Sequence, residues 1–135
     1  MLIVHAGNRI DPPDRSEPRF PASQVSAVAQ RVGRLLDVMQ PAGVVSAPAA
    51  GADLIVLDEA RRRAVPLHVF LPIDTDQFVR ASVGDHDAEW LRLFEAVMDH
   101  ARDDVRSSVS RGDGEAHTDW YLEAHQGLLA HAVEL

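Results

Sequence analysis

Three short, mainly apolar runs alternate with longer segments in which apolar residues recur at helical spacing. The runs cover residues 1–6, 43–47 and 66–71. Short continuous runs of this kind are typical of strands buried on both faces, as in a parallel sheet, whereas a half-exposed strand alternates apolar and polar residues. The pattern therefore predicts three parallel strands.

Helices are predicted between these strands. The first begins near Ser23, after Pro21, and stops before Pro41. Its apolar stripe consists of Val25, Val28, Val32, Leu35, Leu36 and Met39. The second covers residues 53–64, with an apolar side formed by Leu54, Leu57, Ala60 and Ala64. Arginines at positions 61–63 indicate the C-terminal end of this helix, because cations there stabilise the helix dipole.

The predicted order is strand, helix, strand, helix, strand, with right-handed crossovers between parallel strands. This order is half of a doubly wound fold. We expect an α/β, Rossmann-like three-layer sandwich in which a small parallel sheet of about three strands is flanked by helices.

The pattern changes after Pro72, where the sequence becomes polar and rich in turn residues, with about one helical turn at residues 76–81. Asp87 then predicts the N-cap of another helix. The apolar stripe of that helix is Leu91, Phe94, Val97, Met98, Ala101 and Val105. A flexible connection follows at residues 106–117. Thr118 predicts the cap of a last helix, with Tyr121, Leu128, Leu129 and Ala132 facing inward.

Composition limits the functions open to the chain. With 135 residues, 46% hydrophobic and 25% charged, it fits one soluble domain over residues 1–135. There is no cysteine, which excludes disulfides and thiolate chemistry. All 13 basic residues are arginine and the net charge is −8, so nucleic acid is an unfavourable partner. No signal peptide or membrane-spanning run is found, so a cytoplasmic location without membrane contact is expected.

The segments that follow the three strands are the candidate ligand site, because open parallel sheets bind ligands at the carboxyl ends of their strands. These segments are residues 7–11, 46–53 and 72–78. The second contains small residues and leads into a helix, so a phosphate could approach its main-chain N–H groups. The alternative is that the small residues only let helix and sheet pack closely. Neither a P-loop nor the dinucleotide fingerprint is present.

Five side chains in or near these loops are candidates for ligand contacts. Arg9 and Arg19 could grip a phosphate, or could pair with neighbouring carboxylates. Asp53 could accept hydrogen bonds from ribose hydroxyls, could orient the loop, or could simply complement the helix dipole. Ser46 could donate to a ligand or bond local backbone, and Asn8 could contact a base edge or cap a turn.

Histidines and aromatic residues give weaker signals. The seven histidines show no spacing that places two on one helical face around a metal, so no metal site is expected. His5, inside the first apolar run, is interpreted as a core residue. Trp90, Trp120 and Tyr121 are interpreted as packing residues at helix starts.

Several stretches together resemble the SLOG superfamily of Rossmann-like domains. They are "GNRID" at 7–11, "PRFP" at 18–21, "VVSAPAAGADLIVLDEA" at 44–60, "LHVFLP" at 67–72 and "FVRASV" at 78–83. The superfamily joins the DNA-uptake protein DprA with the LOG phosphoribohydrolases, and includes bacterial domains thought to bind nucleotide-derived ligands. The resemblance covers nearly the whole chain and implies a bacterial source.

Carried over by position, the resemblance implies a ligand pocket formed by Gly7, Asn8, Arg9, Ser46, Ala47, Gly51, Ala52 and Asp53. Two positions depart from the family pattern: relatives tend to have histidine in place of Asn8, and many have glycine in place of Ala47. The chain also lacks the later strand and the second glycine-rich loop of the LOG enzymes. We therefore expect an incomplete phosphoribohydrolase site and a C-terminally incomplete domain.

The missing strand would leave the first strand as an exposed apolar edge. We expect either a homodimer or a longer natural protein with a fused or partner effector domain. The leading functional hypothesis is a nucleotide-derivative sensor without a further cofactor, its phosphate held at residues 46–53. The alternatives are a LOG-like hydrolase of nucleoside monophosphates, using Asp53 or Glu59 with Arg9, and an interaction domain with a vestigial pocket.

Overall fold

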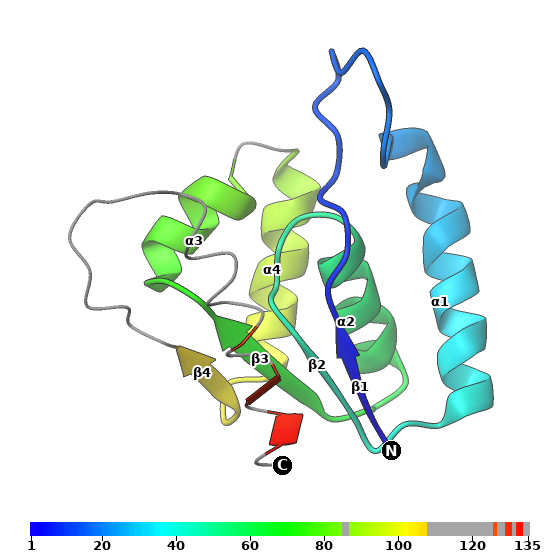
Figure 1. The fold of residues 1–135 in the computed structure, drawn as a ribbon, viewed down its shortest axis with the longest axis vertical. Helices are drawn as coiled ribbons and strands as arrows, with labels where there is room; N and C mark the ends of the chain where they lie inside the picture. The colour runs from blue at the N-terminus through cyan, green and yellow to red at the C-terminus, as the bar shows by residue number, and fades with distance from the viewer. Residues whose placement is uncertain (85–86, 108–125, 127–128, 131, 134–135) are drawn as a thin grey trace.

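The computed structural model describes residues 1–84, 87–107, 126, 129–130 and 132–133. These residues form a parallel sheet in the order β1-β2-β3-β4, flanked by helices (Figure 1). The strands are Leu2–His5 (β1), Gly43–Ser46 (β2), Leu67–Leu71 (β3) and Val105–Ser107 (β4). All neighbouring pairs are parallel, with Val44 beside both Ile3 and Leu67. The predicted Rossmann-like α/β fold and its three strands are confirmed.

The predicted helices are also present, with shifted ends. A short 3-10 turn, η1 (Ala22–Gln24), leads into α1 (Val25–Met39), and α2 spans Ala52–Arg62. In place of one turn after β3 there is a full helix, α3 (Thr75–Ser82), capped by the Asp74 side chain. The next helix, α4 (Ala88–His100), has Asp87 as its N-cap, as predicted.

Strand β4 corrects the prediction for the end of α4. Val105 was expected on the apolar stripe of that helix, but the helix stops at His100. The N–H of Asp104 then donates to the carbonyl of Ala101 at 2.7 Å, and the N–H of Val69 donates to the carbonyl of Asp104 at 3.1 Å. Helical spacing continued by chance across this turn, so Val105 joins the sheet instead.

Other details of the apolar stripes also differ. Leu35, in the stripe predicted for α1, is 56% exposed, and Leu91 in α4 is also exposed. Leu129 was expected to face inward and is 59% exposed. Most of the predicted connection at 106–117 and of the last helix lies outside the described residues. The five described residues between 126 and 133 are helical.

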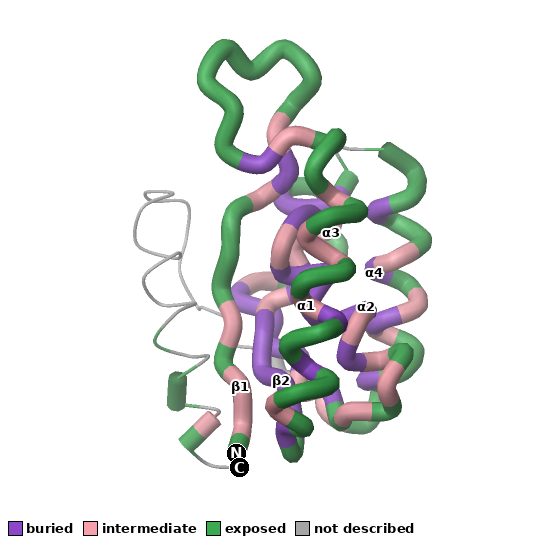
Figure 2. Tube along the Cα trace, turned by 90° about the vertical axis from the view of Figure 1, so that its right-hand side faces the viewer, coloured by how far each residue is buried: buried purple, intermediate pink, exposed green. Residues whose placement is uncertain are grey.

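The sheet has a different covering on each face. Val44, Leu67, Val69 and Leu71 belong to the core shared with the helices, whereas Val45 and Phe70 are buried on the other side, where Ala132 packs against them. Figure 2 shows α1, α2 and α4 on one side of β1 and β2, and the short described C-terminal pieces on the other. With this strand order, right-handed crossovers place every crossover helix on the same face. The three layers are therefore helices, sheet and C-terminal segment.

Strand β1 is an edge of the described sheet. It pairs with β2, and Val4 is 40% exposed although its partner Val45 is fully buried. An apolar edge strand can pair with another chain. The expected homodimer remains a prediction.

The buried helical layer provides a matched test of the fold. Leu57 in α2 has no exposed surface, while Leu35 in α1 is mostly exposed. We predict that Leu57→Ala lowers the free energy of unfolding by about 2–5 kcal/mol, because it leaves a cavity in the core. Leu35→Ala should change it by less than about 0.5 kcal/mol. Urea denaturation of both variants measures the free energy of unfolding. Equal losses would contradict the burial of Leu57 between the helices and the sheet.

An ion-pair network ties α1 to α2. Arg63, just beyond α2, donates through Nε to Asp37 Oδ1 at 2.7 Å and through Nη1 to Glu59 Oε2 at 2.5 Å. The hydrogen bond from Arg63 holds the pKa of Asp37 below its ordinary value of 3.8. A carboxylate whose pKa is lowered by folding stabilises the fold above its ordinary pKa, and this contribution disappears as the pH falls through the lowered value.

We therefore predict that Asp37→Asn lowers the free energy of unfolding at pH 6, and that its difference from wild type shrinks as the pH is lowered below 3.8. Denaturation curves between pH 6 and pH 2 measure the difference. The control is the same substitution in an Arg63→Gln background, where the partner is gone and the pH-dependent difference should vanish. A difference that persists there would contradict the pairing.

Candidate functional site

The loops that follow β1 and β2 are joined to each other at the carboxyl ends of the strands. The N–H of Ile10 donates to the carbonyl of Ala50, and the N–H of Ala52 donates to the carbonyl of Asn8, both at 3.0 Å. Arg9 and Gly51 lie opposite each other between these bonds as an antiparallel bridge. Two of the three loops predicted from the sequence therefore meet at the start of α2.

Close packing accounts for both glycines of this junction. Gly51 has a φ of +126°, and a Cβ added there would lie 2.5 Å from the backbone nitrogen of Ile10. A Cβ on Gly7 would lie 2.5 Å from the Cβ of Ala52 and 2.9 Å from the imidazole carbon Cε1 of His5. Real Cβ atoms do not approach so closely. These two positions therefore support the interpretation that the small residues allow close packing.

Some main-chain N–H groups of the second loop donate hydrogen bonds to carbonyls within the chain. The N–H of Ala50 donates to the carbonyl of Ser82, at the end of α3, at 2.9 Å, and that of Ala52 is used by Asn8. Val83, next to Ser82, has no exposed surface. The "FVRASV" stretch therefore supports the second loop through its backbone. In the third loop, the Asp74 carboxylate accepts from the N–H groups of Asp76 and Gln77 and so caps α3.

Asp53 lies in the first turn of α2 and is buried. Its Oδ1 accepts the N–H of Gly7 at 2.8 Å and lies 3.1 Å from Nδ1 of His5. The carboxylate thus holds the start of the first loop, in addition to complementing the helix dipole. A role for Asp53 in orienting a loop was one of the sequence alternatives, and the structure shows that the loop it holds is the first one.

Ser46 is fully buried at the end of β2. Its hydroxyl is within donating distance of two main-chain carbonyls, that of His5 at 3.0 Å and that of Ala47 at 3.2 Å. These contacts match the alternative in which the serine bonds local backbone. Ala47, the next residue, is half-buried.

The remaining candidates are more accessible. Asn8 is exposed, and Arg9 is partly exposed with its Nε atom buried. Arg19 ends the exposed segment 12–19, which projects beyond the strand ends (Figure 2). Its N–H and that of Phe20 both donate to Asp11 Oδ2 at 2.7 Å. The contacts described for the main chain of Arg19 thus tie it to Asp11 and not to the second loop.

His5 was interpreted from the sequence as a core residue, but it lies at the junction. It is the last residue of β1, its side chain is 26% exposed, and it faces Asp53. The sequence held one signal for this placement, since the last residue of a parallel strand lies at the ligand-binding edge of the sheet. The apolar run around it concealed that signal.

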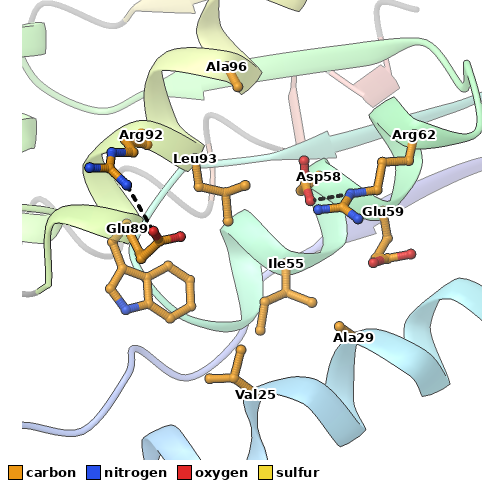
Figure 3. A pocket seen from close by; sticks show the side chains of 11 residues that line it. Val25, Ala29, Ile55, Asp58, Glu59, Arg62, Glu89, Arg92, Leu93 and Ala96 are labelled. Carbon is orange, nitrogen blue, oxygen red and sulfur yellow. Dashed lines mark hydrogen bonds and ion pairs between the residues drawn. The ribbon is translucent and has the colours of Figure 1, made fainter.

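A groove of about 400 Å³ lies in the helical layer, over α2 and between α1 and α4 (Figure 3). Its apolar walls include Val25, Ala29, Ile55, Leu93 and Ala96, and charged side chains stand around them. None of the residues predicted to contact the ligand lines it, but Glu59, named for the hydrolase alternative, does.

The charges around this groove are paired within the chain. Asp58 contacts Arg61 and Arg62, Glu59 contacts Arg63, and Glu89 contacts Arg92. Glu59, which was considered as an alternative to Asp53 in the hydrolase hypothesis, therefore belongs to the groove and not to the junction of the two loops.

No protein-family model matches the chain, and no curated protein matches it either. Within the part of the chain that the structure describes, no helix has the length and apolar character needed to cross a membrane. The same described residues contain no group of three or more histidine, aspartate or glutamate side chains placed to hold a metal ion.

The packing at Gly51 gives a direct prediction. Gly51→Ala should lower the free energy of unfolding by at least about 2 kcal/mol, because alanine is strained at positive φ and its Cβ meets the backbone of Ile10. Thermal or urea denaturation measures the loss. Ala49→Gly in the same loop is the control and should cost no more than about 1 kcal/mol. A Gly51→Ala protein as stable as wild type would mean that the two loops are not joined this closely.

Proposed function

We propose that this domain binds a small anionic ligand of the nucleotide-derived class at the carboxyl ends of β1 and β2. The observation that carries the proposal is the bridge between Arg9 and Gly51, which places the backbone of Arg9, in the first loop, beside the residue that precedes α2. A guanidinium and the N-terminus of a helix both favour a negatively charged group. The two features come from separate segments and converge on one edge of the sheet.

The contacts within the chain divide eight of the nine predicted site residues into two groups, and the ninth, Arg19, is tied by its main chain to Asp11. Gly7, Ser46, Gly51, Ala52 and Asp53 are engaged in holding the two loops together. Asn8, Arg9 and Ala47 retain some exposed surface. In this proposal the first group supports the site, and the second contacts the ligand.

Binding is favoured over hydrolysis as the activity. The LOG-like alternative lacks the second glycine-rich loop of those enzymes, and Glu59, one of its two candidate carboxylates, is held by Arg63 at 2.5 Å on the side of α2 that faces the groove. The overall charge of −8 also favours a small ligand gripped by a local cation over an extended polyanion.

The proposal is tested by calorimetric titration with the four ribonucleoside 5′-monophosphates. We predict that at least one binds, and that Arg9→Ala weakens it about tenfold or more, which corresponds to about 1.4 kcal/mol. Arg92→Ala is the matched control, because Arg92 is an exposed arginine on α4 whose loss should leave affinity unchanged. If no nucleotide binds the wild-type protein, or if both variants bind equally well, the proposal is wrong.

A further inference from the structure

His5 presents its two ring nitrogens to different surroundings. The side chains of Ile3 and His5 lie on the same face of β1, because alternate residues of a strand share a face. Ile3 packs against the helical core, so His5 also faces the helical layer, at the start of α2. There its Nδ1 atom is buried and lies 3.1 Å from Oδ1 of Asp53.

The carboxylate of Asp53 determines which nitrogen of the neutral ring carries the proton. A carboxylate only accepts hydrogen bonds, so the ring nitrogen beside it is stabilised in its N–H form. The contact is not a well-aligned hydrogen bond, since Nδ1 lacks a partner in hydrogen-bond geometry. The attraction between an N–H dipole and a negative charge weakens with misalignment but tolerates a wider range of angles than a hydrogen bond, and at 3.1 Å it still favours the proton on Nδ1. The proton is therefore placed on Nδ1, and the lone pair on Nε2.

The lone pair of Nε2 faces outward. The side chain of His5 is 26% exposed, and Nε2, in contrast to Nδ1, is not buried and lies close to the exposed Gly7. The arrangement is that of a carboxylate–imidazole pair, in which a buried acid orients a histidine and leaves the second nitrogen available. The His5–Asp53 pair lies at the same edge of the sheet as Arg9.

We infer that Nε2 of His5 accepts a hydrogen bond from a sugar hydroxyl of the ligand. This inference rests on the proposed function and narrows it to ligands with a ribose that bears free hydroxyl groups. An ionised phosphate offers only acceptor oxygens, which a nitrogen lone pair repels, whereas a hydroxyl can donate. Arg9 then takes the anionic group and His5 the sugar, while Asp53 is the positioning residue that fixes the tautomer.

The test compares each ribonucleoside 5′-monophosphate with its 2′,3′-dideoxy counterpart by calorimetric titration. We predict that the wild-type protein binds the ribonucleotide about five- to tenfold more tightly, the range of one net hydrogen bond of about 1–1.4 kcal/mol. His5→Phe should abolish this preference and keep the affinity for the dideoxynucleotide. His100→Phe, at an exposed position in the last turn of α4, is the control and should keep the preference.

The outcomes separate the two proposals. If nucleotides bind but ribose and dideoxyribose forms bind equally, the role of His5 is wrong and nucleotide binding stands. If the wild-type protein binds no nucleotide, both fall.

A measurement without ligand tests the positioning role of Asp53. Nitrogen-15 NMR of the His5 ring should show the Nδ1–H tautomer in the neutral wild-type protein. Asp53→Asn keeps an oxygen that can accept the N–H of Gly7, but it removes the charge, so Nε2–H should become populated. A wild-type His5 with its proton on Nε2 would overturn the inference, whatever the binding data.

Discussion

The close contact of the first loop with Gly51 is the constraint on which this end of the molecule depends. The backbone of residues 8–10 lies where any side chain at position 51 would be, so the chain turns into α2 through a conformation that suits glycine. Hydrogen bonds on both sides of this point join β1 to the segment that links β2 and α2. The end of α3 is joined to the same segment through Ser82 and Ala50. Three elements distant in sequence are therefore fixed by one short turn.

Much of the fold followed from the apolar pattern. The strands of the sheet interior are mainly apolar runs because both faces are covered, by helices on one side and by Ala132 on the other. Pro21 and Pro41 bracketed α1, and Asp87 marked the start of α4. Strand β4 could not be predicted in the same way. It has three residues, and Val105 happens to stand at helical spacing from Ala101, so only the turn at Asp104 shows that the helix has ended.

The meeting of the first two loops was predictable from the sequence, but the contacts of each residue there were not. Small side chains serve close packing and ligand approach equally well, and the sequence of residues 46–53 does not distinguish them. The distinction depends on where each main-chain amide finds its acceptor, and the acceptor for Ala50 lies 32 positions later, at Ser82. Asp53 illustrates the same limit, because its contacts with Gly7 and His5 exist only once β1 lies beside α2. Long-range contacts such as these are set by topology and not by local pattern.

The one-sided placement of the helices has a consequence for the order in which the chain assembles. Each helix in the first half follows the strand that it covers, so that face of the sheet can form from neighbouring segments soon after they leave the ribosome. Val45 and Phe70 belong to the opposite face, and their partner Ala132 is synthesised only after the strands are complete. Until residue 132 has been synthesised, its contact with Val45 and Phe70 cannot form. Folding should therefore be sensitive to substitutions at residue 132 in its rate and yield during synthesis, even where the helical face is already in place.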